Sequence, residues 1–201
     1  MQLIYSPASP FVRKVHVTLL ETGQADDVEL VGVHTTPVNT APEAAAANPL
    51  GKIPALLRPD GPAIYDSRVI CRYLSARAGA QLYPEDRIWD VLTLEATADG
   101  LLDAAVLMVY ERRVRPDEMV YTPWIEAQWG KVQGALDVLN ERWVSHLIGP
   151  DTMAQIAVGC AMGYLDFRHG DRNWRKGRDG LANWYADFAQ RDSMLATVPS
   201  G

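Results

Sequence analysis

The sequence has only two cysteines, Cys71 and Cys160, in 201 residues. Two cysteines are too few for a disulfide framework or a cysteine-based metal cluster. Each lies in an apolar helical pattern, where burial as a small hydrophobic residue is the default role. We therefore expect no metal site and a reducing compartment, the cytoplasm.

Positive charge is also scarce. The chain has 19 Lys and Arg against 25 Asp and Glu, a formal net charge of −6. Because proteins that bind a nucleic-acid backbone normally present a basic face, we expect no nucleic-acid partner. Small anionic ligands held by a few donors are not excluded. An arginine-rich stretch, 168–178, is interrupted by Asp171 and Asp179, which favours a solvated loop over an anion site.

No long hydrophobic run is present. The longest nearly apolar stretch, 153–165, is interrupted by Gln155 and falls short of the roughly 20 residues that a membrane span requires. The first ten residues, MQLIYSPASP, lack the basic and then apolar pattern of a signal peptide. We therefore expect no membrane association.

What the sequence does contain is enough apolar material for a core. Hydrophobic residues make up 48% and charged residues 22%, values that are ordinary for globular proteins. Residues 1–79 mix β-like runs with short helical patterns, and 80–85 form a linker. The expected order is strand, helix, strand, helix, two hairpin strands and helix, at 2–5, 10–23, 28–33, 40–47, 53–57, 63–65 and from 66 onward. This order predicts an α/β domain on the thioredoxin plan, with a parallel pair and an antiparallel hairpin.

Two capping patterns mark helix starts. Thr40 and Glu43 have capping-box spacing, which predicts Thr40 as the N-cap of the second helix. Thr152 and Gln155 have the same spacing in the second half of the chain. Residues 86–201 are almost wholly helical in period, with helices expected over 86–114, 124–147, 152–167 and 181–190. Apolar residues run around the third of these, which predicts the buried central helix of an all-α bundle.

Three short segments have residues suited to chemistry. Ser9 precedes Pro10 at a helix start, where free N–H groups and the positive dipole end favour an anion. A proline such as Pro54, at the entrance of a strand, can have a cis bond that turns the backbone of the preceding residue toward a ligand. Asp66 and Ser67 begin another helix and suit an ammonium group and a carboxylate. The alternatives are plain helix caps and a loop that ends in an edge strand.

The sequence resembles the cytosolic glutathione transferase superfamily, especially bacterial members with a serine in the active-site loop. The resemblance extends over nearly the whole chain. The segments that carry it are Ser-Pro-Phe at 9–11, Asn-Pro-Leu-Gly-Lys-Ile-Pro-Ala-Leu at 48–56, Asp66-Ser67 with Ile70 and Tyr73-Leu74, and 159–168. It implies a thioredoxin-like glutathione-binding domain at 1–79, an all-helical domain at 86–201 and a homodimer.

The resemblance also implies roles for individual residues. Ser9 corresponds to the residue that stabilises the glutathione thiolate, so dithiol exchange through a cysteine at this position is disfavoured. Ile53, before Pro54, is expected to pair with the cysteinyl backbone of glutathione. Asp66 and Ser67 are expected to hold the γ-glutamyl head. Further glutathione contacts are expected from Phe11, His34 and Lys52, the last two at the glycyl carboxylate.

The implied activity is conjugation of glutathione, as co-substrate, to small electrophiles, as in detoxification. We expect the electrophile pocket between the first domain and the long helix of the second. Its expected lining is Met108, Tyr110, Arg112, Arg113 and Tyr164, residues that packing and a solvated surface would also explain. Two alternatives remain: a glutathione-dependent isomerase, peroxidase or dehalogenase with the same site, and a non-catalytic interaction or regulatory module.

Overall fold

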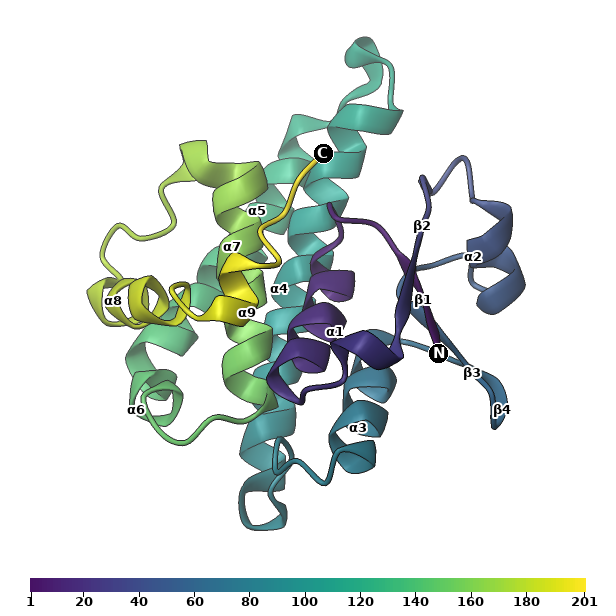
Figure 1. Cartoon of the computed structure of the whole chain (residues 1–201). Helices are drawn as coiled ribbons and strands as arrows, with labels where there is room; N and C mark the ends of the chain where they lie inside the picture. The colour runs from purple at the N-terminus through teal and green to yellow at the C-terminus, as the bar shows by residue number, and fades with distance from the viewer. The chain divides into compact units, whose positions relative to one another are not determined.

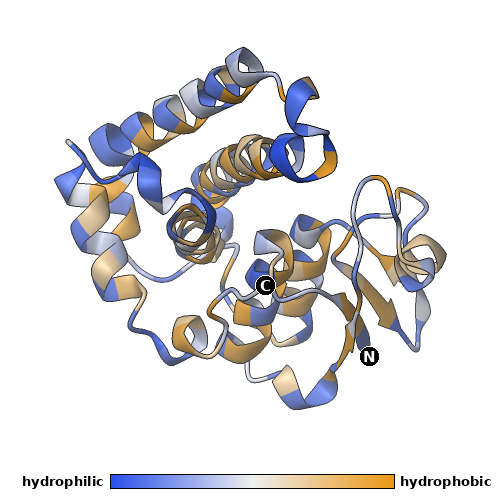
Figure 2. Ribbon diagram, turned by 90° about the horizontal axis from the view of Figure 1, so that it is seen from above, coloured by the Kyte–Doolittle hydropathy of each residue, from blue (hydrophilic) through white to orange (hydrophobic).

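The computed structural model describes residues 1–201, which form two compact units (Figure 1). The first unit comprises Met1–Ile88 and Asp192–Gly201, and the second comprises Trp89–Arg191. No helix is both long enough and apolar enough to cross a membrane. Within each unit, hydrophobic residues gather on the strands and on the helix faces that turn toward neighbouring elements (Figure 2).

The first unit is built on a four-stranded sheet of order β2-β1-β3-β4. β1 pairs in parallel with β2 and antiparallel with β3, and β3 pairs antiparallel with β4. The mixed thioredoxin-like sheet predicted from the sequence is therefore confirmed. The strands are β1 (Gln2–Tyr5), β2 (Glu29–Gly32), β3 (Ala55–Arg58) and β4 (Gly61–Ile64).

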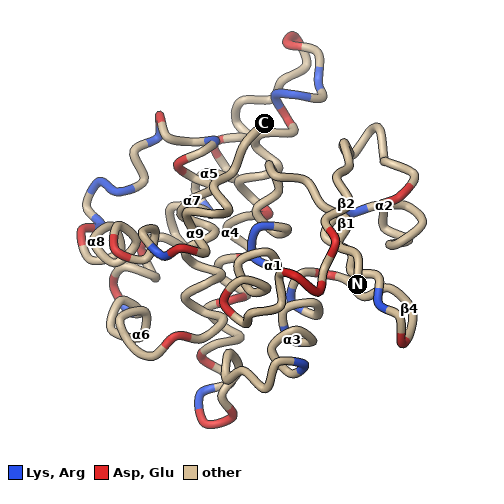
Figure 3. The backbone as a smooth tube through the Cα atoms, viewed as in Figure 1, with Lys and Arg blue, Asp and Glu red and all other residues tan.

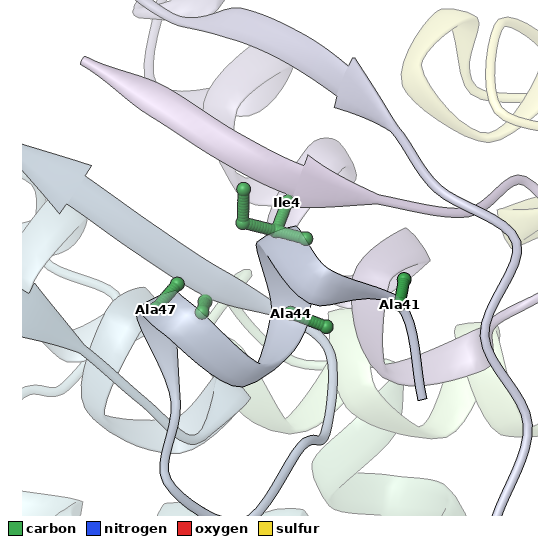
Figure 4. Close-up of a cluster of buried hydrophobic side chains, with 5 residues drawn as sticks. Ile4, Ala41, Ala44 and Ala47 are labelled. Carbon is green, nitrogen blue, oxygen red and sulfur yellow. The ribbon is translucent and has the colours of Figure 1, made fainter. Parts of the chain in front are cut away.

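Helices cover both faces of this sheet (Figure 1). α1 (Pro10–Glu21) and α3 (Ser67–Arg77) pack against each other on one face. α2 (Pro42–Ala47) covers the other face, where its alanines meet Ile4 (Figure 4). Small alanine side chains let this short helix lie close to the strands. Short 3₁₀ turns, Ala25–Asp27 and Glu85–Arg87, complete the unit before its last segment.

The N-cap predicted for α2 is wrong. The helix begins at Pro42 with Ala41 as its N-cap, and no side chain caps it. The Thr40 side chain instead lies beside Gly51, where an added Cβ would be 2.8 Å from the Thr40 methyl carbon. Gly51 has a φ of +63°, a conformation that glycine adopts without steric cost. Thr40 therefore packs against the following loop instead of capping α2.

The last ten residues return to the first unit. They include α9 (Asp192–Leu195), which sequence periodicity did not predict. Arg13 on α1 holds this segment: its Nη2 donates to the Met194 carbonyl at 3.0 Å and its Nε to Thr197 Oγ1 at 3.3 Å. The Ser193 hydroxyl also donates to the Glu21 carboxylate. The C-terminal segment is thus fixed to α1 by side-chain hydrogen bonds.

The second unit is all helical, as predicted. The Thr152–Gln155 capping box is present, with Thr152 N donating to Gln155 Oε1 at 2.9 Å, and every residue from Met153 to Leu165 is buried. The helix expected over 124–147 contains a π-helical segment, Leu139–Trp143. The helices are α4 (Ile88–Val114), α5 (Thr122–Val138), α6 (Val144–Leu147), α7 (Met153–His169) and α8 (Asp179–Phe188), with 3₁₀ turns at Asp117–Met119 and Gly170–Arg172.

Candidate functional site

The strand register brings the predicted site segments of the first unit to one end of the sheet. Ile4, near the end of β1, is opposite Ala55, the first residue of β3. Leu56 pairs with Ile64, the last residue of β4. The loop after β1, the residues before β3 and the residues after β4 therefore emerge at the same end of the strands. We call this end of the sheet the sheet edge. Ser9, Ile53 and Asp66 lie on these three segments.

Ser9 is the N-cap of α1. Its Oγ accepts a hydrogen bond from Val12 N at 3.3 Å, and its backbone has φ −84° and ψ 121°. Its own N–H donates to the Ser6 carbonyl at 3.1 Å, which fixes the loop. Pro10 begins the helix, where its missing N–H has no cost.

Capping does not use up the Ser9 hydroxyl. A serine hydroxyl has one donor proton and two acceptor lone pairs, and the cap occupies one lone pair. The half-buried hydroxyl can therefore donate its proton to a neighbouring anion while it caps the helix. The structural and the functional interpretations of Ser9 are compatible with each other.

Ile53 and Pro54 stand directly before β3. The Ile53–Pro54 bond is cis, an isomer that the sequence leaves open. The preceding loop is held by Asn48, whose Nδ2 donates to the Lys52 carbonyl at 2.9 Å and whose Oδ1 accepts from Leu50 N at 3.0 Å. The β1–β3 ladder starts at Ala55, so the backbone groups of Ile53 lie outside it. A ligand with an extended backbone would find its hydrogen-bonding partners there.

Asp66 is the N-cap of α3. Oδ1 accepts from Arg68 N at 3.0 Å, Oδ2 accepts from Arg68 Nη2 at 3.2 Å, and the Tyr65–Asp66 bond is cis. Partial burial raises the pKa of the Asp66 carboxyl, but the Arg68 hydrogen bonds and charge, together with the Lys14 charge, outweigh it and lower the pKa. The carboxylate is therefore ionised at neutral pH and suited to an ammonium group.

The N-termini of α1 and α3 point to the same sheet edge, because each helix follows a strand that ends there. Their first N–H groups have no partner inside the helix and carry partial positive charge. Ser67, the first residue of α3, is 2% exposed. The edge thus combines anion-binding N–H groups, two hydroxyls and one carboxylate.

The three remaining residues predicted in this unit lie around the same end. His34 follows β2, whose last residue, Gly32, is opposite Tyr5 of β1. His34 and Lys52 are exposed, and Phe11, in the first turn of α1, is half-buried. The structure places them near the segments of the site and records no contact among them.

Of the five residues predicted in the second unit, three influence one another and two stand apart. Met108 is buried in α4, and the Arg112 charge acts on Glu126. Tyr110, Arg113 and Tyr164 influence one another electrostatically and form one group.

Arg168 also belongs to this group, although the sequence pattern did not point to it. It lies in the last turn of α7 and not in a solvated loop. Its spacing of four residues from Tyr164 was the available signal, because residues at this spacing share a helix face. In the rest of the arginine-rich stretch 168–178, ion pairs join Arg172 to Glu126, Arg175 to Asp166 and Arg178 to Asp137.

Comparisons with known proteins agree with the fold. The family models "Glutathione S-transferase, N-terminal domain" and "Glutathione S-transferase, C-terminal domain" match residues 8–77 and 122–187. A relative from Escherichia coli K12, the "Uncharacterized GST-like protein YibF", is 33% identical over 99% of this chain and 98% of its own length.

Two similar solved structures are of a glutathione transferase family member from Pseudomonas fluorescens Pf-5. One contains bound glutathione and has a TM-score of 0.96 at 45% identity, covering 100% of this chain and 99% of that chain. The other contains S-(propanoic acid)-glutathione and has a TM-score of 0.92 at 45% identity, covering 100% of both chains. The chain belongs to the glutathione transferase superfamily.

Proposed function

We propose that the protein binds glutathione at the sheet edge of the first unit and transfers it to a small electrophile. The observation that carries this proposal is the Ser9 hydroxyl, which caps α1 and retains a proton to donate at a helix N-terminus. The bound glutathione and the bound glutathione thioether in the Pseudomonas fluorescens structures support it.

Each part of glutathione has a matching group at this edge. The ionised Asp66 carboxylate would hold the γ-glutamyl ammonium, and the Ser67 hydroxyl with the first N–H groups of α3 would hold the adjacent carboxylate. The Ile53 backbone would pair with the cysteinyl backbone. His34 and Lys52, both exposed, would reach the glycyl carboxylate.

The proposed catalytic step depends on the pKa of the glutathione thiol. A free thiol with a pKa of about 8.5 is only a few per cent thiolate at pH 7, and the thiolate is the nucleophile. Lowering that pKa by about 2 requires roughly 2.7 kcal/mol of preferential stabilisation. A hydrogen bond to a charged group contributes about 1.5–3 kcal/mol and a helix N-terminus about 0.3–1 kcal/mol. The Ser9 hydroxyl and the start of α1 together are sufficient.

The thiolate would then attack an electrophilic carbon and form a carbon–sulfur bond. In a substitution the leaving group takes the bonding electron pair. In an addition the π electrons move to the neighbouring carbon, which takes up a proton. Ser9 remains a hydrogen-bond donor throughout and forms no covalent intermediate.

Isothermal titration with glutathione near pH 7, in two buffers of different ionisation enthalpy, tests this proposal. We expect binding with release of about 0.7 of a proton, because a thiol with a pKa of about 6.5 is mostly thiolate at pH 7. Ser9→Ala should abolish the proton release, whereas Ser6→Ala, a matched change in the same loop, should retain it. No binding at millimolar glutathione would overturn the proposal and favour a non-catalytic interaction module.

A further inference from the structure

The C-terminal segment of the first unit runs along α1 toward the loop that contains Ser9 (Figure 1). The Ser193 hydroxyl donates to the Glu21 carboxylate at the end of α1. At the other end of the segment, a Cβ built on Gly201 would lie 3.6 Å from the Ala8 Cβ, an ordinary contact distance. The segment therefore contacts both the end of α1 and the residue directly before Ser9.

Arg13 joins this segment to the N-terminal half of α1. Its Nη2 donates to the Met194 carbonyl at 3.0 Å, and its Nε donates to Thr197 Oγ1 at 3.3 Å. The Thr197 hydroxyl donates in turn to the Ser193 carbonyl at 2.8 Å. Arg13, Met194 and Thr197 are 6%, 1% and 9% exposed, so water hardly competes for these hydrogen bonds. We call the contacts of Arg13 with Met194 and Thr197 the Arg13 clamp.

The backbone of Arg13 is bonded directly to Ser9. Arg13 N donates to the Ser9 carbonyl at 3.0 Å, in the hydrogen bond that opens α1. Ser9 N donates to the Ser6 carbonyl at 3.1 Å, and Ser9 Oγ accepts from Val12 N at 3.3 Å. Ser9 thus lies between two residues that the C-terminal segment contacts, Ala8 on one side and Arg13 on the other. A shift of that segment would therefore move the loop that carries the Ser9 hydroxyl.

The buried guanidinium of Arg13 has a cost that stability alone does not explain. Both of its acceptors are neutral, and Nη1 is buried without a hydrogen-bond partner. Burial of a polar or charged group that is incompletely paired lowers stability. Basic residues lie in the N-terminal half of α1, whose one acidic residue, Glu21, is its last (Figure 3). This order of charges opposes the helix dipole, so the charges of α1 are not arranged for helix stability.

The geometry of the Arg13 clamp explains why an arginine occupies this position. A guanidinium is a planar fork whose donors point in fixed directions, so one side chain can bind two acceptors and fix both. The Met194 carbonyl lies on α9, and the Thr197 hydroxyl lies just beyond it. A lysine ammonium on its flexible stem would bind such acceptors without fixing their directions. The clamp therefore holds the C-terminal segment in one orientation relative to α1.

We propose that the Arg13 clamp positions the Ser9 hydroxyl for the glutathione thiolate, with Arg13 and Thr197 as positioning residues. The inference rests on the proposed function, because the position of Ser9 matters only if its hydroxyl donates to the thiolate. The cap that Ser9 makes, at 3.3 Å, is longer than the usual range for an N–H···O hydrogen bond, so the cap alone holds the hydroxyl weakly. A hydroxyl that points at the thiolate for less of the time stabilises it less, so a weakened clamp should raise the thiol pKa.

Two variants weaken the Arg13 clamp and leave the charge of the protein unchanged. Thr197→Val removes the acceptor of Arg13 Nε, and Arg13→Lys removes the fork. Ultraviolet absorbance of the thiolate, followed against pH with saturating glutathione, measures the pKa of the bound thiol. We expect that pKa to be higher than in the wild type by about 0.5 or more in both variants, which lowers the ratio of thiolate to thiol at least about threefold. If Arg13→Lys does not fold, the conservative change Thr197→Val alone decides the test.

Arg77→Gln is the matched control, because Arg77 joins α3 to Asp27 at 2.7 Å in the same unit and is not part of the Arg13 clamp. It should retain the wild-type thiol pKa. The wild-type pKa in both Thr197→Val and Arg13→Lys would overturn the inference, even if unfolding free energy falls, because the clamp would then be structural only. A raised pKa in Arg13→Gln but in neither of these two variants would also overturn it, since Arg13 would then act through its charge.

The Ser9→Ala background shows whether the clamp acts through Ser9. Thr197→Val should raise the thiol pKa in the wild type and leave it unchanged in Ser9→Ala, because the hydroxyl that the clamp positions is already absent. Equal rises of the thiol pKa in the two backgrounds would overturn the inference.

The wild-type titration separates this inference from the proposed function. A lowered thiol pKa in the wild type supports the proposed function whatever the clamp variants show. The same lowered pKa in the wild type and in the clamp variants therefore overturns the inference alone. A wild-type thiol pKa equal to that of free glutathione, or no glutathione binding, would overturn the proposed function and with it the inference.

Discussion

The two units build their candidate sites in different ways. The sheet edge of the first unit is made of chain ends: helix caps, a residue before a strand and free backbone groups near Ser9, Ile53 and Asp66. In the second unit, the residues that influence one another are long side chains on two helices, Tyr110 and Arg113 on α4 and Tyr164 on α7. The first kind of site depends on local motifs, whereas the second depends on how helices pack.

Since the site of the first unit depends on helix caps, we expect substitution of Asp66 to have the largest effect on ligand binding. Asp66→Ala removes both the α3 cap and the negative charge, and Asp66→Asn retains a capping side chain and removes the charge. We expect both variants to weaken glutathione binding about tenfold or more. Asp66→Ala should lower the free energy of unfolding by about 1 kcal/mol, and Asp66→Asn, which keeps a capping side chain, should lower it less.

Titration calorimetry and denaturant unfolding measure these two quantities. Asp26→Ala, at an exposed carboxylate away from the strand ends of the site, is the control. Arg68 and Lys14 keep the pKa of Asp66 below its ordinary value. The contribution of the ionised Asp66 carboxylate to glutathione binding should therefore be complete above the ordinary aspartate range. It should be lost as pH falls through the lowered pKa. Loss of binding already above the ordinary aspartate pKa would contradict this account.

An intermediate effect, on stability alone, is expected at the capping box of the second unit. Thr152→Ala removes the hydroxyl that accepts from Ala154 N at 3.2 Å. The expected cost is about 1–2 kcal/mol of unfolding free energy, measured by denaturant titration. Thr122→Ala, at a helix start without a side-chain cap, should change stability by less than about 0.5 kcal/mol. Equal costs for the two variants would contradict a structural role for the box.

The smallest effect on stability is expected from breaking an exposed ion pair. Glu126→Gln breaks the ion pair with Arg172, whose Nη1 lies 2.9 Å from Glu126 Oε2. Exposed ion pairs contribute little to stability because water screens them, so the unfolding free energy should hardly change. A large loss of unfolding free energy in denaturant titration would contradict this ranking and give the Glu126–Arg172 pair a structural role.

Local patterns predicted much of the fold. The N-cap positions of Ser9 and Thr152 follow from a polar residue directly before an apolar periodic segment, and the structure has both. The same reasoning failed at Thr40, because packing against Gly51, which is remote in sequence, determines where that side chain lies. The helix α9 was missed because four residues are too few to show a helical period.

Non-local features limited the prediction of the site. Local patterns suggested Ser9, Pro54 and Asp66 one at a time, and only the strand register shows that their segments reach one end of the sheet. Arg168 was assigned to a loop because charged neighbours obscured the end of α7. The relation of Arg168 to Arg113 depends on α4 and α7 packing together, which no local pattern encodes.

Ser9 is proposed to lower the pKa of the bound glutathione thiol, and the function depends most directly on this shift. Ultraviolet absorbance of the thiolate, followed against pH with saturating glutathione, measures that pKa directly. We predict a value about 2 below that of the free thiol for the wild type and Ser6→Ala, and a return toward about 8.5 for Ser9→Ala. The same thiol pKa in the wild type and Ser9→Ala would contradict the account.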